Sequence, residues 1–347
     1  MNDKLIFFLI ILVTLIFTIT TAIHYKLPIG EDITFHLDVA NYYHEGKSFS
    51  EVLDIIKTPY PPLFHYLLLP TYIFKTIDWV LFLQIIFYPL ALLSIGWIVG
   101  KELSWKHAII TVLLLISSYG FFDRVIQVTP QAIDMIFFSL SIYFFLRDKK
   151  LGFILSNLVI FYSHSFFGLL LFGAFGLFWL FKKKGLTIIL LSLLTFILVI
   201  IMTYPVIMYK ADYTVNVVES QNMAVRTKPI FTMMYLGGVV VFIPLLLTLG
   251  KKTFKNDFNF LVLCWMVVLT PLLFTLTDRY ITYAVVPLSI LASVGIMKTK
   301  GNLRSILIWM VVWMGILLMV YYFYMTLTSS HHIQLEHLMN IKEKIMS

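Results

Sequence analysis

LIFFLIILVTLIFTITTAI, at residues 5–23, decides the class of this protein, because the stretch is apolar and contains no charged residue. A helix crosses a hydrocarbon core of about 30 Å with roughly 18 or more consecutive apolar residues. Similar runs recur along the chain, and the last covers residues 306–327. The first run follows a charged start, as a signal peptide does, but it is long and more apolar runs follow it. We therefore predict that it is the first transmembrane helix.

The composition of the whole chain also indicates a membrane protein. Its 347 residues are 60% apolar and 13% charged, with a mean hydropathy of +0.91, whereas about 25% of the residues of a soluble domain are charged. Cys264 is the only cysteine, so the chain can form neither an internal disulfide nor a cysteine-based metal site. The net charge of +8 comes from cations in short clusters between apolar runs, which is typical of membrane topology rather than of nucleic-acid binding.

The cationic clusters predict the topology, because Lys and Arg resist translocation and remain on the cytoplasmic side. The clusters are Lys101–Lys106, Arg147–Lys150, Lys182–Lys184, Lys251–Lys255 and Lys298–Arg304. The remaining loops should face outward, and they cover residues 24–59, 123–130, 163–166, 209–229 and 277–280. We therefore expect a multi-pass protein of the cell membrane with its polar loops, and its active site, on the extracytoplasmic face.

The apolar runs predict an all-α fold, a polytopic membrane helix bundle of about 11 transmembrane helices in a single membrane-embedded domain over residues 1–347. The outer loop 24–60 should carry interfacial helices, and residues 328–347 should form a short outer tail. Residues 61–74 are too short and too proline-rich for a span, so we expect an interfacial or re-entrant helix there. The predicted spans are residues 5–23, 79–99, 107–122, 131–146, 150–163, 165–181, 186–208, 230–249, 258–276, 280–297 and 303–327.

The first outer loop is the most polar stretch of the chain, and Glu31 and Asp32 lie shortly after the first span. A carboxylate this close to a membrane span costs free energy unless water solvates it or it has a function. Asp32 and His36 are four residues apart, so they would share one side of a helix that runs from about residue 33 to residue 43. The alternative is that the loop is a solvated amphipathic connector.

The run Gly30-Glu-Asp-Ile-Thr-Phe-His36, followed by Pro59-Tyr-Pro-Pro-Leu-Phe-His-Tyr66, resembles the first outer loop of the GT-C superfamily of membrane glycosyltransferases. That superfamily includes protein O-mannosyltransferases, lipid A aminoarabinose transferases and the oligosaccharyltransferase catalytic subunit. In its members an acidic pair follows the first helix, and a Pro-Pro-Leu motif opens a membrane-surface helix. Asp123-Arg124, the segment 157–168 and Asp278-Arg-Tyr280 also match its general run of features.

This resemblance implies a hexosyl- or pentosyltransferase that takes a sugar from a polyprenyl phosphate, such as dolichyl phosphate. The acceptor would be a hydroxyl on a lipid, a glycan or a protein, and the bilayer would be the surrounding solvent. Asp32 aligns with the catalytic carboxylate of the family and is the expected base, although Glu31 occupies the neighbouring position and remains an alternative. Arg124 and Arg279 are expected to bind the donor phosphate, because a guanidinium suits bidentate phosphate recognition. The alternative for both arginines is snorkelling to the interface.

Three further residues are candidates for binding a metal or the substrate. Asp123, His36 and His164 all fall on loops predicted to face outward, and carboxylate with histidine is a ligand combination for a divalent metal such as Mg, Mn or Zn. The alternatives are an ion pair for Asp123 and ordinary interfacial histidines. Tyr60, beside the proline pair, is the candidate for stacking on a sugar.

Two other classes of protein fit the same pattern. A transporter or flippase of polyprenyl-linked glycans would also be polytopic, but it would place ionisable groups near the bilayer midplane and show internal repeats. A non-catalytic subunit of a glycan assembly complex would keep the fold without the activity. The polar groups of this chain lie at loop ends on one predicted face, which favours an enzyme.

Overall fold

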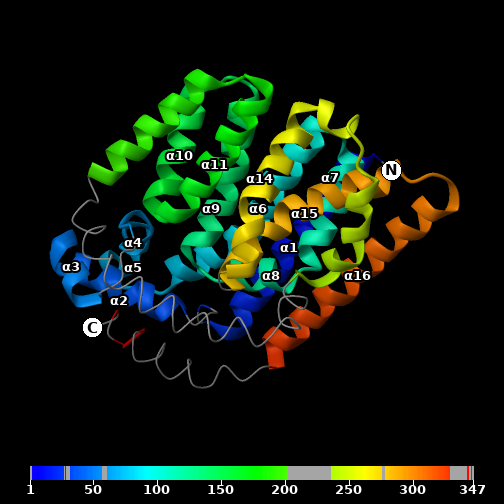
Figure 1. The fold of residues 1–347 in the computed structure, drawn as a ribbon. Coiled ribbons are helices and arrows are strands. Elements are labelled where there is room, and N and C mark those ends of the chain that lie inside the picture. Colours follow the sequence, from blue (N-terminus) through cyan, green and yellow to red (C-terminus); the bar gives the residue numbers. More distant parts are fainter. Residues whose placement is uncertain are drawn as a thin grey trace.

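The computed structural model describes residues 2–26, 28, 32–56, 61–201, 236–275, 278–328, 342–343 and 345. Every regular element within these ranges is helical, which confirms the predicted all-α fold. Most of the longer helices run side by side in a bundle, with four short helices that follow the first long helix gathered at one end (Figure 1).

The first half of the chain supplies the elements that carry the predicted site. They are α1 (Asp3–Tyr25), α2 (Asp32–His44), α3 (Phe49–Ile56), α4 (Leu63–Leu68), α5 (Pro70–Ile73), α6 (Asp78–Glu102), α7 (Trp105–Ile116), α8 (Tyr119–Ile126), α9 (Pro130–Leu146), α10 (Lys150–Ser163) and α11 (Ser165–Lys182). After a helix over Leu186–Ile201, the described chain continues with η1 (Gly237–Thr248), η2 (Thr253–Lys255), α14 (Asp257–Thr275), α15 (Asp278–Lys298) and α16 (Gly301–Thr328).

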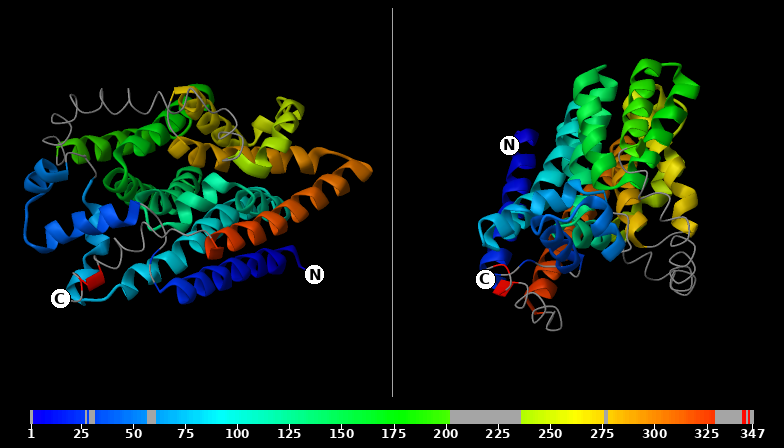
Figure 2. Two further views of the ribbon diagram at one scale, coloured as in Figure 1. Left: turned by 90° about the horizontal axis from the view of Figure 1, so that it is seen from below. Right: turned by 90° about the vertical axis from the view of Figure 1, so that its left-hand side faces the viewer.

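Three of the described helices, α1, α6 and α16, are long and apolar enough to cross a membrane by themselves. The bent pair α7 and α8 is a fourth candidate. In the other apolar helices the part whose side chains the structure describes is shorter, at 10–17 residues, as in Asp257–Thr270 of α14 and Thr282–Lys298 of α15. α1 and α16 lie along one edge of the bundle (Figure 2), where their apolar side chains remain exposed, as expected for helices that face lipid. The predicted span 230–249 contains the 3-10 helix η1, whose sequence includes Gly237, Gly238 and Pro244, three poor α-helix formers.

The segment predicted as the first outer loop is helical, and its interfacial position stays a prediction. α2 matches the expected helix over residues 33–43 to within one residue at each end. In residues 61–74 the chain forms α4 and α5, which meet at Leu69, just before Pro70. At about 1.5 Å per residue, neither helix approaches the roughly 30 Å of a hydrocarbon core. This segment therefore stays at one end of the bundle, as the cationic pattern requires.

The largest departure from the predicted topology is a break within the predicted span 107–122. α7 and α8 are separated by Ser117 and Ser118, and their directions differ by 81°. Ser118 has an extended backbone, and its hydroxyl accepts the N–H of Phe121 at 3.4 Å, which caps α8. The prediction of one continuous span was therefore wrong. Hydrophobicity is unchanged across the two serines, so it does not reveal that one helix ends and another begins.

Two distant segments compensate for this break. The Phe121 N–H, which would bond to the Ser117 carbonyl in a continuous helix, bonds to Ser118 instead. The Tyr322 hydroxyl and the Gly238 N–H each donate to the Ser117 carbonyl at 3.2 Å. A Cβ on residue 238 would lie 2.5 Å from Ser117 Oγ, so only glycine permits this approach. Irregular backbone at membrane depth is stable where the protein satisfies it in this way.

Contacts between the cationic clusters bring them together at one end of the bundle, which we call the lysine end. α2 to α5 and α8 lie at the opposite end, which we call the α2 end (Figure 1). The orientation of these two ends relative to the cytoplasm stays a prediction. The contacts at the lysine end are Arg147 with Glu102 at 2.7 Å, Lys182 with the carbonyl of Lys255 at 3.3 Å, and Lys298 with the Thr253 hydroxyl.

Candidate active site

Asp32 is the first residue of α2 and the first carboxylate that the structure describes after α1. A carboxylate is favoured in the first turn of a helix by the helix dipole. Ile33 and Leu37 on the same helix are fully buried, whereas the Asp32 side chain keeps 30% of its surface exposed. Packing of the apolar side of α2 therefore holds this carboxylate at the α2 end without sealing it from solvent.

Arg124 brings Asp32 together with the second predicted acidic group. Its Nη1 donates to Asp32 Oδ2 at 2.9 Å, and its Nε lies 3.8 Å from Asp123 Oδ2. Gln127 Nε2 donates to Asp123 Oδ1 at 3.1 Å, and the Thr129 hydroxyl donates to the Arg124 carbonyl at 2.9 Å. We call Asp32, Asp123 and Arg124 the acidic triad. The break between α7 and α8 gives Asp123 and Arg124 a short helix of their own, which points them toward α2.

The acidic triad contains two carboxylates and one guanidinium, so it has one net negative charge when all three groups are ionised. The Arg124 side chain is only 13% exposed, which holds its fork in a defined place. A guanidinium carries five N–H donors and can bond to an anion while it contacts carboxylates. The site thus combines a proton acceptor with an anion-binding group.

His36 lies one turn after Asp32, but its described contacts lead away from the acidic triad. His36 Nδ1 and His65 Nε2 are 3.0 Å apart, and both rings are buried, with Phe64 packed against His36. Burial holds the pKa of His65 well below its usual value of 6.5, the nearby His36 lowers it further, and the Pro61 carbonyl opposes these effects. The histidine pair therefore joins α2 to α4 close to Asp32.

His164 lies at the turn between α10 and α11, where the sequence predicted it. Its ring centroid is 6.4 Å from that of Tyr283 on α15. The described contacts thus connect His164 with α15 rather than with Asp32. Glu31, Tyr60 and the side chain of Arg279 lie outside the described parts of the chain, so their predicted roles stay predictions.

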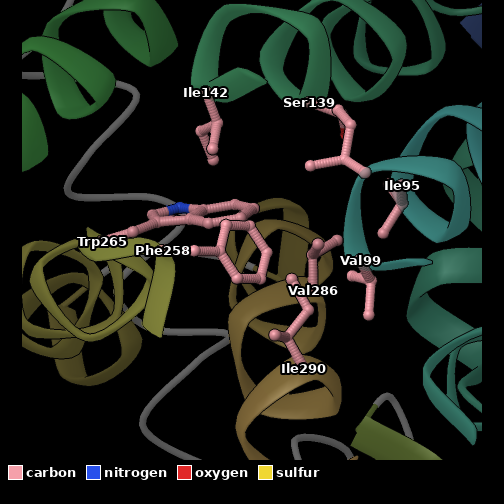
Figure 3. Close-up of a pocket in the computed structure, with 9 residues that line it drawn as sticks. Ile95, Val99, Ser139, Ile142, Phe258, Trp265, Val286 and Ile290 are labelled. Carbon is pink, nitrogen blue, oxygen red and sulfur yellow. The ribbon is translucent and has the colours of Figure 1, made fainter. Parts of the chain in front are cut away.

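A pocket lies between α6, α9, α14 and α15, at a distance from the acidic triad. Trp265, Phe258 and Ile142 form much of its wall, and Ser139 contributes a hydroxyl that bonds back to its own helix (Figure 3). The lining residues come from the ends of α6, α9 and α15 that lead to the lysine end. This pocket is almost entirely apolar and contains none of the predicted site residues.

Comparisons with known proteins give a likeness to a solved structure. No family model and no curated protein matches this sequence. Among solved structures, the chain is similar to the crystal structure of ArnT from Cupriavidus metallidurans bound to undecaprenyl phosphate. The TM-score is 0.53 and the identity is 13%, over 99% of this chain and 76% of the ArnT chain. ArnT is a GT-C aminoarabinose transferase. The fold is GT-C-like.

At this identity the likeness establishes the fold and not the activity of the chain. Within the GT-C-like fold, Asp32, Asp123 and Arg124 meet at one end of the bundle although up to 92 residues separate them in the sequence. No group of three or more His, Cys, Asp or Glu side chains capable of holding a metal occurs among the described residues. The predicted metal, for which Asp123, His36 and His164 were candidates, therefore stays a prediction.

Sequence reasoning missed a buried polar contact between α9 and α15. The Tyr283 hydroxyl donates to Asp134 Oδ2 at 3.1 Å, and neither side chain is more than 1% exposed. A signal was present, because Asp134 is the only charged residue between Pro130 and Leu146. Its position inside a predicted span also contradicts the expectation that the ionisable groups lie only at loop ends.

Proposed function

We propose that this protein is a membrane glycosyltransferase that moves a sugar from a polyprenyl phosphate to an acceptor hydroxyl. The observation that carries the proposal is the acidic triad at the α2 end of a GT-C-like bundle. The similarity to the structure of ArnT bound to undecaprenyl phosphate supports a lipid-linked phosphate as the leaving group. We further propose that the α2 end faces outward, because the cationic clusters gather at the opposite end.

In the proposed reaction Asp32 is the general base. Its carboxylate takes the proton of the acceptor hydroxyl, while the acceptor oxygen forms a bond to the anomeric carbon of the sugar. The bond from that carbon to the phosphate oxygen breaks, and polyprenyl phosphate leaves with the electron pair. Asp32 remains partly exposed, so an acceptor from solution or from the lipid surface can reach it. A base in this position contributes about a hundredfold or more to the rate. Glu31 remains the alternative base.

Arg124 and Arg279 are the proposed binding groups for the donor phosphate. Arg124 is largely buried and held by Asp32, so it can present further N–H groups without an added cost of ordering. Negative charge grows on the phosphate as the bond to the sugar breaks, and prepositioned cations stabilise that charge. Asp123 would then keep Arg124 oriented, or hold a divalent metal that assists the same phosphate.

The direct test uses the purified protein in lipid nanodiscs with undecaprenyl and dolichyl phosphates that carry hexoses or pentoses. Release of free polyprenyl phosphate is the measurement. We expect Asp32→Asn to abolish transfer without loss of folded protein, and Asp38→Asn, the same change on the same helix, to retain it. Activity in Asp32→Asn with loss in Glu31→Gln would move the base by one position. Activity in both variants would contradict the acid-base proposal.

One observation favours the transporter or flippase alternative. Asp134 is a fully buried ionisable group inside a predicted span, and such groups often mark transport pathways. The two functions separate in a vesicle assay that follows a fluorescent polyprenyl-linked sugar. Movement of the intact lipid between leaflets without cleavage of the sugar would replace the transferase proposal with transport.

A further inference from the structure

The buried contact between Asp134 and Tyr283 has no part in the proposed chemistry. Asp134 is fully buried on α9, and within the described residues its Oδ1 has no hydrogen-bond partner. Its Oδ2 accepts the hydroxyl of Tyr283 on α15. A carboxyl group at such a place is costly and is usually kept for a function. The bond joins the start of α15 to α9, close to the connection from α8.

The neighbouring residue on α15 makes a second contact at the same level. The Thr282 hydroxyl donates to the carbonyl of Gly120 on α8 at 2.9 Å, and Thr282 is fully buried. α15 is therefore tied to α8 through Thr282 and to α9 through Tyr283. Gly120 lies one turn before Asp123 and Arg124 on α8, so this tie is adjacent to the acidic triad.

Helix geometry relates these ties to Arg279. Position 279 precedes Thr282 by three residues and Tyr283 by four, so all three positions share one side of α15, one turn apart. The side of α15 that carries position 279 is therefore the side that is tied to α8 and α9.

A proline makes this part of α15 dependent on the ties. Pro287 lies inside the helix and has no N–H, so the carbonyl of Tyr283 loses its regular helical partner. The first turns of α15 are consequently joined to the remainder of the helix by a weakened point. Tyr283 thus donates its hydroxyl to Asp134, and its own carbonyl lacks the helical N–H that residue 287 would supply.

We propose that Asp134 and Tyr283 are positioning residues for the lipid-linked phosphate. They hold the first turns of α15 beside α8, so that Arg279 and Arg124 act on the same phosphate. This inference rests on the proposed function, since it assigns Arg279 to the donor. A directional O–H···O bond fixes the rotation of α15, which apolar packing alone does less strictly.

The test measures the KM for the lipid-linked sugar donor in nanodiscs, together with direct binding of undecaprenyl phosphate by native mass spectrometry. Tyr283→Phe and Asp134→Ala should each weaken donor use by about tenfold in KM with little change in kcat. Asp134→Asn should recover most of the loss, because an amide oxygen still accepts the tyrosine hydroxyl. Ser139→Ala is the matched control on α9, since Ser139 bonds only to its own helix in the described contacts.

A double mutant decides whether the effect passes through Arg279. In an Arg279→Ala background, Tyr283→Phe should add almost nothing to the donor KM. A further tenfold rise of the donor KM in that background, or a wild-type KM in Tyr283→Phe alone, would overturn the inference. The failure of the proposed function looks different, because the wild-type protein would then neither bind undecaprenyl phosphate nor cleave the donor. If Asp134→Ala fails to fold, Tyr283→Phe still gives the answer.

Discussion

Two clusters of three charged groups lie at opposite ends of the bundle and have opposite composition. At the α2 end, Arg124 lies between two carboxylates of the acidic triad. At the lysine end, Asp257 lies between Lys182 at 3.2 Å and Lys184 at 2.6 Å, and we call these three residues the basic triad. The central Arg124 side chain is 13% exposed, whereas the Lys184 side chain is 64% exposed.

The two triads differ in exposure to water, so they should differ in how much each ion pair contributes to stability. Water can replace the partners of an exposed lysine, so an exposed ion pair contributes little to stability. The partly buried guanidinium of the acidic triad has less access to water, and its loss would leave two carboxylates without the cation that contacts both. Changes at the α2 end should therefore have large effects, and changes at the lysine end should have small ones.

The largest expected effect is that of Arg124→Ala. We expect transfer from the lipid-linked donor to fall by about a hundredfold or more, because a prepositioned cation is lost where negative charge develops. Arg147→Ala is the matched control, since Arg147 is an arginine paired with a carboxylate, that of Glu102, but its side chain is 48% exposed at the lysine end. Turnover in nanodiscs should change by less than about twofold in this control. Equal activity in both variants would show that the acidic triad has no role in the reaction.

An intermediate effect is expected on stability as the pH falls. The folded-state pKa of His65 is depressed mainly by burial, so the unfolded chain binds more protons below about pH 6.5. The contribution of neutral His65 is therefore complete above that pH and is lost as the pH falls, at up to about 1.4 kcal/mol per pH unit. Melting temperatures of the detergent-solubilised protein at pH 7.5 and 5.5 measure this loss.

Two histidine variants give the pH prediction its control. His65→Gln should reduce the difference in melting temperature between the two pH values, and His24→Gln, at an exposed position near the end of α1, should leave the difference unchanged. The same difference in melting temperature in wild type and in His65→Gln would assign the acid sensitivity to other groups.

The smallest effect is expected for the basic triad. Asp257→Asn should lower stability by less than about 1 kcal/mol and leave transfer unchanged, because both lysines can be solvated. The difference from wild type should shrink further in about 1 M salt, where the Debye length is about 3 Å. Thermal unfolding at low and high salt measures both quantities. A large, salt-independent loss would mean that this triad is as constrained as the acidic one.

Much of the fold could be predicted because lipid imposes a simple pattern on sequence. The boundaries of α6, for example, follow from a long apolar run that ends at Lys101, and α2 follows from the polar loop after the first span. The break at Ser117 and Ser118 could not be predicted, since serine hydroxyls cap a helix or bond within it according to tertiary contacts. The sequence was thus informative about spans and uninformative about where a span turns.

The candidate site was predicted in part for a related reason. Asp32 could be chosen from the resemblance to the GT-C superfamily, and Asp123 and Arg124 from their position at the end of an apolar run. The structure brings these three together. Their pairing could not be deduced, because it depends on the direction of α8 after the break. Asp134 was missed because one acidic residue hardly changes the hydropathy of a long run, although its burial makes it costly.

The carbonyl of Ser117 has a consequence for the biosynthesis of the protein. Its two donors lie at residue 238 and at residue 322, on segments that leave the ribosome long after α7 and α8. Until the last long helix has entered the bilayer, this polar group has no complete set of partners in the apolar layer, and the bend before α8 is unsupported. The bend that orients α8, and with it the acidic triad, is therefore complete only once residues 238 and 322 are in place.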